Sequence, residues 1–335
     1  MKKKICYYDA DVKKLPLFRK KQKEVIGILG YGIQGRAQAL NLRDSGYNVF
    51  ISNKNDHYKI KAIDEGFKVV NFKKIVDLVD VLIILIPDAD QKAVLEENII
   101  SNLKNNQLLI FAHGYNLYYK TIKFPKFVDI AMLAPRFPGK PIRERFLEGS
   151  GVSAFIDSYQ DNTKKCLERT LIIALALGFT RSGVLRAKVS DETEADLFIE
   201  HFMAPLFYKS VEESVNFLKK QGLSEYISVM ELYFSGELGS VRTMMSKRGL
   251  YKTLYENASP TCKFGVSHYM KEIFTNDLKK KMKKIFMEIR NKKFLKLLEK
   301  EQKNNYKYTN NFFAKRSKNS ISKIEKKLNK LIIKK

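Results

Sequence analysis

The sequence predicts an α/β domain of the Rossmann type, with a doubly wound sheet, followed by an all-α domain. Short apolar runs alternate with helical stretches through the first 187 residues, which is typical of a parallel sheet covered by helices. A glycine-rich turn follows the first of these runs. Beyond residue 187 the strand-like runs disappear and helical periodicity continues to the end. We therefore expect two domains, residues 1–187 and residues 188–335.

The elements are predicted in order from their apolar patterns. Residues 24–30 (EVIGILG) form the first strand, and residues 34–45 form a helix that ends at Gly46. In the rest of the first domain we expect strands at residues 48–52, 68–72, 81–87, 107–114, 129–135 and 151–158, and helices at 58–65 and 162–177. In the second domain we expect helices at residues 192–220, 224–234 and 238–256, followed by long helices to the C-terminus.

Composition excludes several classes of protein. Apolar residues make up 44% of the 335 residues, which is too many for a disordered chain. The longest apolar runs are about half as long as a membrane-spanning helix requires. Three cysteines without CxxC spacing indicate reduced thiols, and the basic N-terminus lacks the apolar stretch of a signal peptide. We expect a cytoplasmic protein that does not associate with membranes.

The formal net charge of +26 raises the question of a nucleic-acid partner. Residues 271–335 contain 22 basic and 6 acidic residues, so +16 of this charge lies at the C-terminal end. Only 13 of the 62 basic residues are arginine, the residue that binds bases through bidentate contacts. We interpret the tail lysines as the solvated faces of amphipathic helices and expect no specific nucleic-acid partner. A polyanion-binding tail is the alternative.

The glycine-rich turn predicts a dinucleotide-binding site. Residues 30–35 (GYGIQG) match G-x-G-x-x-G between a predicted strand and a predicted helix. Gly30 permits a tight turn, Gly32 lets the backbone approach a pyrophosphate, and Gly35 allows close packing of helix against strand. The helix N-terminus adds amide donors for the anion. The alternative is a structural turn that binds nothing.

The end of the second predicted strand favours NADP over NAD. No acidic residue that would hold the ribose 2′-hydroxyl stands at the strand tip, where residues 52–59 are SNKNDHYK. Lys54 and Lys59 can neutralise a 2′-phosphate. Asp56, slightly further along, favours NAD instead.

Acidic residues open the first helix of the second domain. Asp196 and Glu200 are four residues apart and therefore share one helical face. Like charges at this spacing repel, unless a cation such as Mg²⁺ bridges them. The spacing alone leaves open both a metal site and a solvated acidic helix start that the helix dipole favours. Glu231 and Glu237 form a second acidic group on another predicted helix.

Several motifs resemble those of ketol-acid reductoisomerase (acetohydroxy acid isomeroreductase), in the short class of this family. The matching segments follow one another along nearly the full length of the chain: residues 7–11 (YYDAD), 30–46, 87–91 (PDADQ), 111–116 (FAHGYN), 192–200 (ETEADLFIE) and 259–265 (SPTCKFG). The tail, residues 282–331, is similar to the final helices of the family.

The resemblance implies an activity, cofactors and an assembly. Family members convert 2-acetolactate or 2-aceto-2-hydroxybutanoate by a Mg²⁺-dependent alkyl migration. They then reduce the resulting 2-keto acid with NADPH, in the biosynthesis of valine, leucine and isoleucine. The resemblance further implies two Mg²⁺ ions, a homo-oligomer whose active site is shared between subunits, and a knotted helical domain.

The resemblance also implies roles for individual residues. Asp196 would bridge two Mg²⁺ ions, Glu200 would bind one, and Glu231 would come from a partner subunit. His113 would be the catalytic histidine near the nicotinamide, and Ser259 would bind the substrate. Residues of three segments would line the cofactor site: Tyr31, Gly32, Ile33, Gln34, Asp88, Ala89, Asp90, Gln91 and Gly139.

The chain departs from the family pattern at several positions. The family has Glu-x-x-x-Glu where Glu231 is followed by Ser235, so Glu237 is the candidate replacement ligand, although a regular helix would rotate it about 240° from Glu231. Arg136, a candidate substrate residue, replaces a family lysine, and Lys263 replaces a glutamate. Two alternatives therefore stay open: a divergent relative that reduces another 2-keto acid, and a degenerate, basic polyanion-binding copy.

Overall fold

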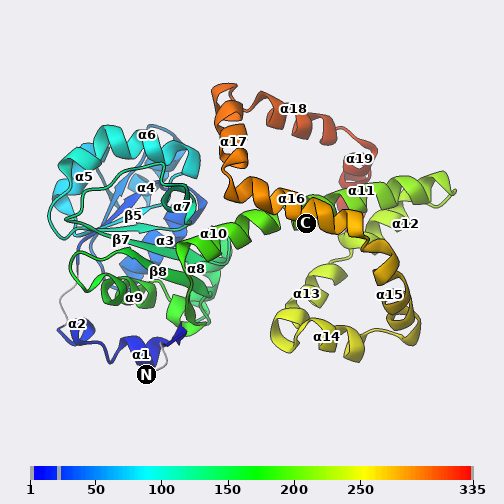
Figure 1. Cartoon of the computed structure of the whole chain (residues 1–335), viewed down its shortest axis with the longest axis horizontal. Helices are drawn as coiled ribbons and strands as arrows, with labels where there is room; N and C mark the ends of the chain where they lie inside the picture. Colours follow the sequence, from blue (N-terminus) through cyan, green and yellow to red (C-terminus); the bar gives the residue numbers. More distant parts are fainter. Residues whose placement is uncertain (1–3, 21–23, 333–335) are drawn as a thin grey trace. The chain divides into compact units, whose positions relative to one another are not determined.

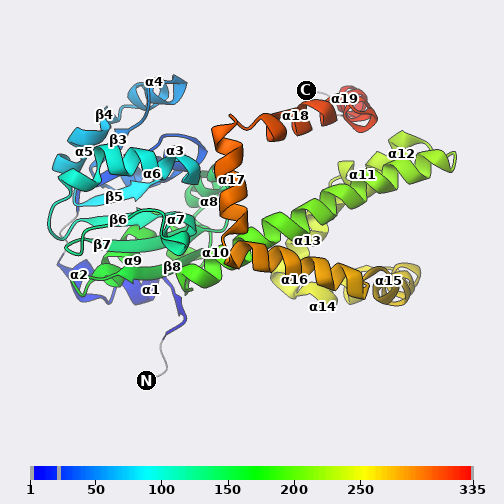
Figure 2. The ribbon, with the colours of Figure 1, turned by 45° about the horizontal axis from the view of Figure 1, so that its top comes forward.

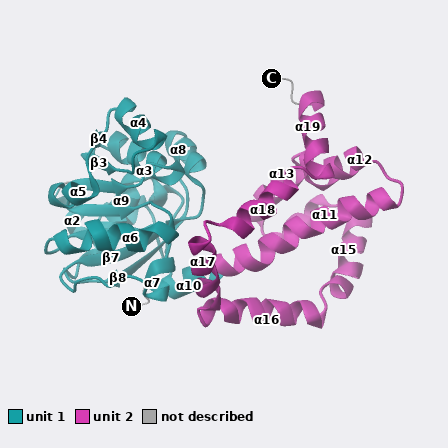
Figure 3. Cartoon of the chain, turned by 90° about the horizontal axis from the view of Figure 1, so that it is seen from above, with its two compact units in different colours: residues 1–195 teal, residues 196–335 magenta. Residues whose placement is uncertain are grey.

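The structure, a computed structural model, describes residues 4–20 and 24–332 of the chain. The chain divides into two compact units, Met1–Ala195 and Asp196–Lys335 (Figure 3). The domain boundary predicted after residue 187 falls in the connection that precedes helix α10, ahead of the division between these units. Each unit is described separately below.

The described residues of unit 1 form a nine-stranded sheet with helices between the strands (Figure 1). The strands are β1 (Cys6–Tyr7), β2 (Ile26–Leu29), β3 (Val49–Ser52), β4 (Lys68–Val69), β5 (Val81–Ile84), β6 (Leu108–Phe111), β7 (Asp129–Pro135), β8 (Ala154–Gln160) and β9 (Val184–Arg186). The α-helices are α1 (Asp9–Val12), α2 (Pro16–Arg19), α3 (Ile33–Asp44), α4 (His57–Asp64), α5 (Phe72–Leu78), α6 (Asp88–Asn98), α7 (Tyr115–Tyr119), α8 (Gly139–Leu147) and α9 (Cys166–Ala176). Short 3₁₀ turns lie at η1 (Ile100–Asn102) and η2 (Phe179–Arg181).

The sheet is mixed, whereas the sequence predicted a parallel one. Its strand order is β1-β9-β8-β7-β6-β5-β2-β3-β4, and the strands from β7 to β4 are parallel. Strand β8 runs antiparallel to β7. Ala154 at the start of β8 pairs with Pro135 at the end of β7. Strand β1 is also antiparallel to its neighbour β9.

Side chains of the central strands point alternately to the two faces of the sheet and belong to two separate hydrophobic cores. On one face Ile83 and Ile110 belong to a core shared with α3, α8 and α9. On the other face Leu82 and Leu109 pack with α5, α6 and α7. Figure 2 shows the sheet between these two helical layers. Strands buried on both faces explain the continuous apolar runs in the sequence.

Two local predictions for unit 1 were wrong. The strand predicted at residues 68–72 ends at Val69. Helix α5 follows at once, because the Asn71 side chain accepts a hydrogen bond from the Lys74 amide at 2.8 Å and caps the helix. Strands β1 and β9 were not predicted, since runs of two and three residues carry no recognisable alternation.

The described residues of unit 2 are helical. After α10 (Val189–Phe198), which begins in unit 1, come a π-helical turn η3 (Ile199–Met203), α11 (Ala204–Lys220), α12 (Glu225–Val229), a second π-helical turn η4 (Met230–Phe234) and α13 (Glu237–Arg248). The later helices are α14 (Leu250–Asn257), α15 (Pro260–Ile273), α16 (Asn276–Arg290), α17 (Lys293–Lys303), α18 (Lys307–Arg316) and α19 (Ser320–Ile332). The expected knot stays a prediction.

Unit 2 buries little of its apolar surface. One core cluster consists of four residues on α11, α12 and α19: Val215, Val229, Ile324 and Leu328. Large apolar side chains elsewhere are open to solvent, including Tyr255 at 74%, Ile273 at 73% and Tyr208 at 71% exposure. In the part of the chain that the structure describes, none of the helices has the length and apolar character needed to span a bilayer.

Candidate active site

The glycines of the turn between β2 and α3 have the geometry that pyrophosphate binding requires. Gly30 has a φ of +96°, a conformation that favours glycine. A Cβ on Gly35 would lie 1.9 Å from the Gly30 carbonyl oxygen, so α3 approaches the turn as closely as its backbone permits. A Cβ on Gly32 would meet no atom within 4 Å. Gly32 therefore faces open space where a ligand can approach.

The Tyr31 side chain contacts the protein interior and does not face the open space beside Gly32. Its side chain is fully buried, and its hydroxyl donates to Glu65 Oε2 at 2.6 Å. Burial and the neighbouring Glu65 carboxylate raise the pKa of the Tyr31 hydroxyl. Its backbone N–H donates to Asn53 Oδ1 at 2.8 Å, which ties the turn to the end of β3. The side chain of Tyr31 is thus a structural anchor for the turn.

A cleft of about 870 Å³ opens at the carboxyl ends of β2, β3, β5 and β6. Ligands of open α/β sheets bind at this edge. The cleft brings together most of the predicted cofactor residues and the predicted catalytic histidine: Gly30, Gly32, Ile33, Gln34, Lys54, Asp88, Ala89, Asp90, Gln91 and His113. Four predicted cofactor residues do not line it: Tyr31, Gly35, Lys59 and Gly139.

Gly139 contributes through packing. A Cβ at this position would lie 2.0 Å from the Ile33 carbonyl oxygen, so the start of α8 rests directly on the start of α3. Gln34 Nε2 also donates to the Phe137 carbonyl at 3.0 Å. These contacts hold the loop after β7 beside the glycine-rich turn.

The loop after β3 determines which charges face the ribose end of the cleft. Asp56 caps α4: its Oδ1 accepts from the Tyr58 amide at 2.9 Å and from Asn53 Nδ2 at 2.8 Å. Asp56 Oδ1 is therefore engaged as a helix cap, and Asp56 also lines the cleft. Lys54 is exposed and lines the cleft, whereas Lys59 Nζ donates to Asn55 Oδ1 at 2.8 Å.

His113 lies just after β6, with Asp88 from the start of α6 beside it. Its Nδ1 is 2.7 Å from Asp88 Oδ2. One ligand atom of His113 and one of Glu192 lie within 4.8 Å of each other. The histidine therefore stands between the cofactor cleft and a carboxylate of α10.

Glu192 is a site residue that sequence reasoning missed. It is buried, and its carboxylate accepts from the Gly114 amide at 3.1 Å and from Arg136 Nη1 at 3.2 Å. A Cβ on Gly114 would lie 2.3 Å from Thr193 Oγ1, so only glycine lets α10 approach β6 this closely. Glu192 stands four residues before Asp196, as Glu200 stands four after it, and this triple spacing was the available sequence signal.

Arg136, the predicted substrate residue, is held by two contacts. Its guanidinium forms the ion pair with Glu192 and stacks over the Phe155 ring at 5.1 Å. Arg136 is exposed and directly follows the end of β7. A planar guanidinium thus replaces the compact ammonium of the family lysine.

The predicted metal ligands and Ser259 lie on helices of unit 2. Asp196 is half-buried on α10, and Glu200 lies in the π-helical turn η3. Glu231 lies in the second π-helical turn η4, and Glu237 begins α13; both are exposed. Ser259 caps α15, accepting from the Cys262 amide at 3.2 Å.

No single regular helix joins Glu231 to Glu237, in agreement with the break predicted between residues 234 and 238. The helix ends after Phe234, and Gly236, with a φ of +83°, turns the chain into α13. The 240° rotation expected for a regular helix does not apply here. Glu231 instead lies within a π-helical turn, a local irregularity that is frequent at functional sites, and Glu237 follows this turn at the start of α13.

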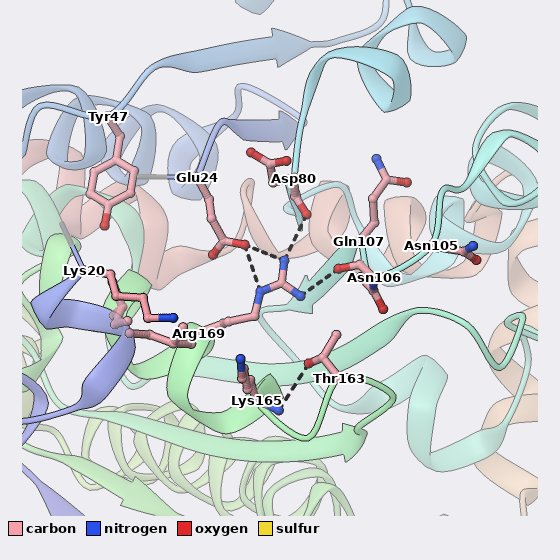
Figure 4. Close-up of a pocket in the computed structure, with 12 residues that line it drawn as sticks. Lys20, Glu24, Tyr47, Asp80, Asn105, Asn106, Gln107, Thr163, Lys165 and Arg169 are labelled. Atoms are coloured by element: carbon pink, nitrogen blue, oxygen red, sulfur yellow. Dashed lines mark hydrogen bonds and ion pairs between the residues drawn. The ribbon is translucent and has the colours of Figure 1, made fainter. Parts of the chain in front are cut away.

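A second cavity, of about 620 Å³, lies at the opposite, amino-terminal edge of the sheet (Figure 4). Arg169 crosses it and donates to Glu24 Oε1 at 2.8 Å and to the buried Asp129 Oδ2 at 2.8 Å. Nearby, burial raises the pKa of the Cys166 thiol to about 12, so this thiol stays protonated. The charged groups here satisfy one another, and we ascribe a structural role to them.

Models of two protein domains match the chain. Residues 20–183 match the acetohydroxy acid isomeroreductase NADPH-binding domain. Residues 189–333 match the ketol-acid reductoisomerase C-terminal domain.

Individual relatives are similar over most of their length. The ketol-acid reductoisomerase (NADP(+)) of Pyrobaculum aerophilum is 36% identical over 82% of this chain and 83% of its own. That of Pyrobaculum islandicum is 36% identical over 87% of this chain and 86% of its own. Among solved structures, an NADH-preferring ketol-acid reductoisomerase from an uncultured archean aligns with a TM-score of 0.90 and 28% identity, over 98% of this chain and 99% of that one.

Proposed function

The chain belongs to the ketol-acid reductoisomerase family, in its short class I form, and from this premise we propose a role for each part of its site. Its activity is that of ketol-acid reductoisomerase in branched-chain amino acid biosynthesis. We infer that it takes 2-acetolactate or 2-aceto-2-hydroxybutanoate, moves an alkyl group with the help of Mg²⁺, and forms the 2,3-dihydroxy-3-methyl acid with NADPH. The match of both domains argues against a degenerate polyanion-binding copy.

We propose that NADPH is the preferred reductant. Its pyrophosphate would lie over Gly32 at the start of α3, where helix amides and the helix dipole favour an anion. Lys54, exposed at the cleft, would neutralise the 2′-phosphate. Asp56 also lines the cleft, with its Oδ1 engaged as the cap of α4, so the proposed preference rests on Lys54. One structurally similar relative prefers NADH, so this loop and not the fold carries the preference.

Carboxylates of unit 2 would hold the metal ions. Asp196 and Glu200 supply the oxygen ligands that Mg²⁺ prefers, at a spacing that is repulsive without a cation. Glu231, with Glu237 as the candidate replacement for the missing second glutamate, would complete the site from a partner subunit. Bound there, the ions would polarise the carbonyl and hydroxyl oxygens of the substrate.

The remaining groups would handle protons and the substrate. A proton must reach the keto oxygen as the hydride arrives at carbon, and we assign this proton to His113 because its ring lines the cofactor cleft. Arg136, fixed by Glu192, would offer positive charge to the substrate carboxylate. Ser259 would bind the substrate from the start of α15.

We propose a homo-oligomer, at least a dimer, with an active site shared between subunits. Unit 2 leaves large apolar side chains exposed on several helices, more than a monomer ordinarily tolerates. The exposed positions of Glu231 and Glu237 suit ligands that serve a neighbouring subunit.

We also propose that the enzyme works in the cytoplasm. All three cysteines, Cys6, Cys166 and Cys262, lie among the described residues and are free thiols. Sparse, unpaired cysteines are typical of a reducing compartment.

The observation that carries this proposal is the common cleft of the glycine-rich turn and His113, in a chain whose two domains both match the family. The test is Asp196→Asn, which should abolish conversion of 2-acetolactate and weaken Mg²⁺ binding in calorimetry, while NADPH still binds. Asp191→Asn, a matched acid-to-amide change at the exposed start of α10, should leave both measurements unaltered. Unchanged turnover of the Asp196 variant would refute the metal role.

A further inference from the structure

A network of buried polar side chains lies behind His113. It joins the start of α6 to the segment after β6, two neighbouring loops at the carboxyl edge of the sheet. Its members are Asp88, Gln91 and Asn116, and the two amide side chains are buried. Buried polar groups are costly unless they are hydrogen-bonded, so their partners reveal what the network holds in place.

Both carboxylate oxygens of Asp88 are engaged within the protein. Oδ2 lies 2.7 Å from His113 Nδ1, and Oδ1 accepts from Gln91 Nε2 at 3.0 Å. The Asp88 carbonyl oxygen accepts from Asn116 Nδ2 at 2.9 Å. Asp88 is therefore fixed at three atoms.

The two amides hold each other in a single orientation. Asn116 Nδ2 also donates to Gln91 Oε1 at 2.8 Å, and Gln91 Nε2 also donates to the Ile86 carbonyl at 3.1 Å. A flip of Gln91 would set its Nε2 against Asn116 Nδ2, and a flip of Asn116 would set its Oδ1 against Gln91 Oε1. The carboxylate consequently meets His113 at a defined angle.

This arrangement selects one tautomer of the histidine. An ionised carboxylate only accepts hydrogen bonds, so His113 Nδ1 must carry the hydrogen. The chemistry of His113 toward the cleft then passes through Nε2, which accepts a proton in this tautomer and delivers one only after the ring has become an imidazolium beside Asp88.

We propose that the Asp88 side chain, held by Gln91 and Asn116, positions His113 and sets its tautomer. This inference rests on the proposed function, because it assumes that His113 acts in the reaction. Asp88 and Gln91 also line the cofactor cleft, so this role of their side chains is additional to their place beside the cofactor. All three are positioning residues, since they act through the histidine.

The kinetic test is Asp88→Asn, an isosteric change that lets the side chain donate as well as accept. We expect kcat to fall about 10–100-fold, as for other carboxylate partners of functional histidines, with the Kd for NADPH unchanged in fluorescence titration. Glu97→Gln, the same chemical change at an exposed position of α6, is the control and should leave both values unaltered. A higher Kd for NADPH with unchanged kcat would overturn the proposal.

A double-mutant cycle with His113→Ala separates positioning from any independent role. If Asp88 acts through the histidine, Asp88→Asn should cause no further loss in the His113→Ala background. A further loss of the same size as in the wild-type background would contradict the proposal.

A spectroscopic readout does not depend on turnover. The chain has four histidines, so ¹⁵N-labelled imidazole signals can be assigned by substitution. We expect His113 to be protonated at Nδ1 in the intact enzyme and to become a mixture of tautomers in Asp88→Asn. An Nε2-protonated neutral ring in the wild type would overturn the proposal. Absence of turnover with the expected tautomer would instead refute only the proposed function.

Discussion

At the scale of single residues, the glycines of the turn after β2 serve different purposes. Gly35→Ala would place a Cβ 1.9 Å from a backbone oxygen, and the backbone must shift to relieve this contact. We expect a loss of about 1–3 kcal/mol or more in the free energy of unfolding, measured by denaturant titration. Gly32→Ala, whose Cβ meets nothing within 4 Å, should fold normally but bind NADPH more weakly. Equal stability of the two variants would contradict this division of roles.

Arg169 tests whether the cavity at the amino-terminal edge is structural. Arg169→Met would leave Asp129 buried without its cationic partner, and breaking a buried ion pair in this way costs about 3–5 kcal/mol. Lys165→Met, at an exposed position on the rim of the same cavity, should change the free energy of unfolding by no more than about 0.5 kcal/mol. A stable Arg169 variant would argue for a binding role at this cavity.

Residue roles were predicted better where local geometry decides them. The conformation of Gly30 and the closeness of Gly35 followed from the motif alone, because both depend on the adjoining strand and helix. The anchoring of Tyr31 by Glu65 and the ion pair of Arg136 with Glu192 join residues 34 and 56 positions apart. No local pattern encodes such pairs, so a single sequence could not reveal them.

At the scale of elements, α19 closes the small core of unit 2. Leu328→Ala should destabilise the protein by about 2–5 kcal/mol, because Leu328 is only 4% exposed and contributes to the cluster with α11 and α12. Leu331→Ala, on the same helix but 70% exposed, should have little effect. Thermal unfolding of both variants at the same protein concentration measures the difference in their stability. Equal losses would show that the helix is held by other contacts.

The boundaries of elements show where sequence patterns were sufficient. The central strands were predicted because burial on both faces gives continuous apolar runs. The π-helical turns at Glu200 and Glu231 were not predicted, since one extra residue in a helical turn hardly alters the apolar periodicity, whereas the break at Gly236 matches the gap between the helices predicted at residues 224–234 and 238–256. The short strands β1 and β9 depend on pairing with distant partners and leave no local trace.

At the scale of the whole molecule, a cofactor-binding sheet and a helical, carboxylate-bearing unit are joined in one chain. The net charge of +26 does not determine this architecture. The tail lysines follow the polar faces of helices α16 to α19. Family, fold and activity were all predictable from ordered motifs. The second metal site was not, because its ligands would come from another subunit.

The most direct test of the central claim measures NADPH oxidation by the purified enzyme with 2-acetolactate, in saturating Mg²⁺ and in EDTA. A simple 2-keto acid serves as the comparison substrate. We predict NADPH consumption that requires both 2-acetolactate and Mg²⁺. Folded protein that consumes no NADPH with 2-acetolactate in saturating Mg²⁺, yet reduces the simple 2-keto acid in EDTA, would contradict the account.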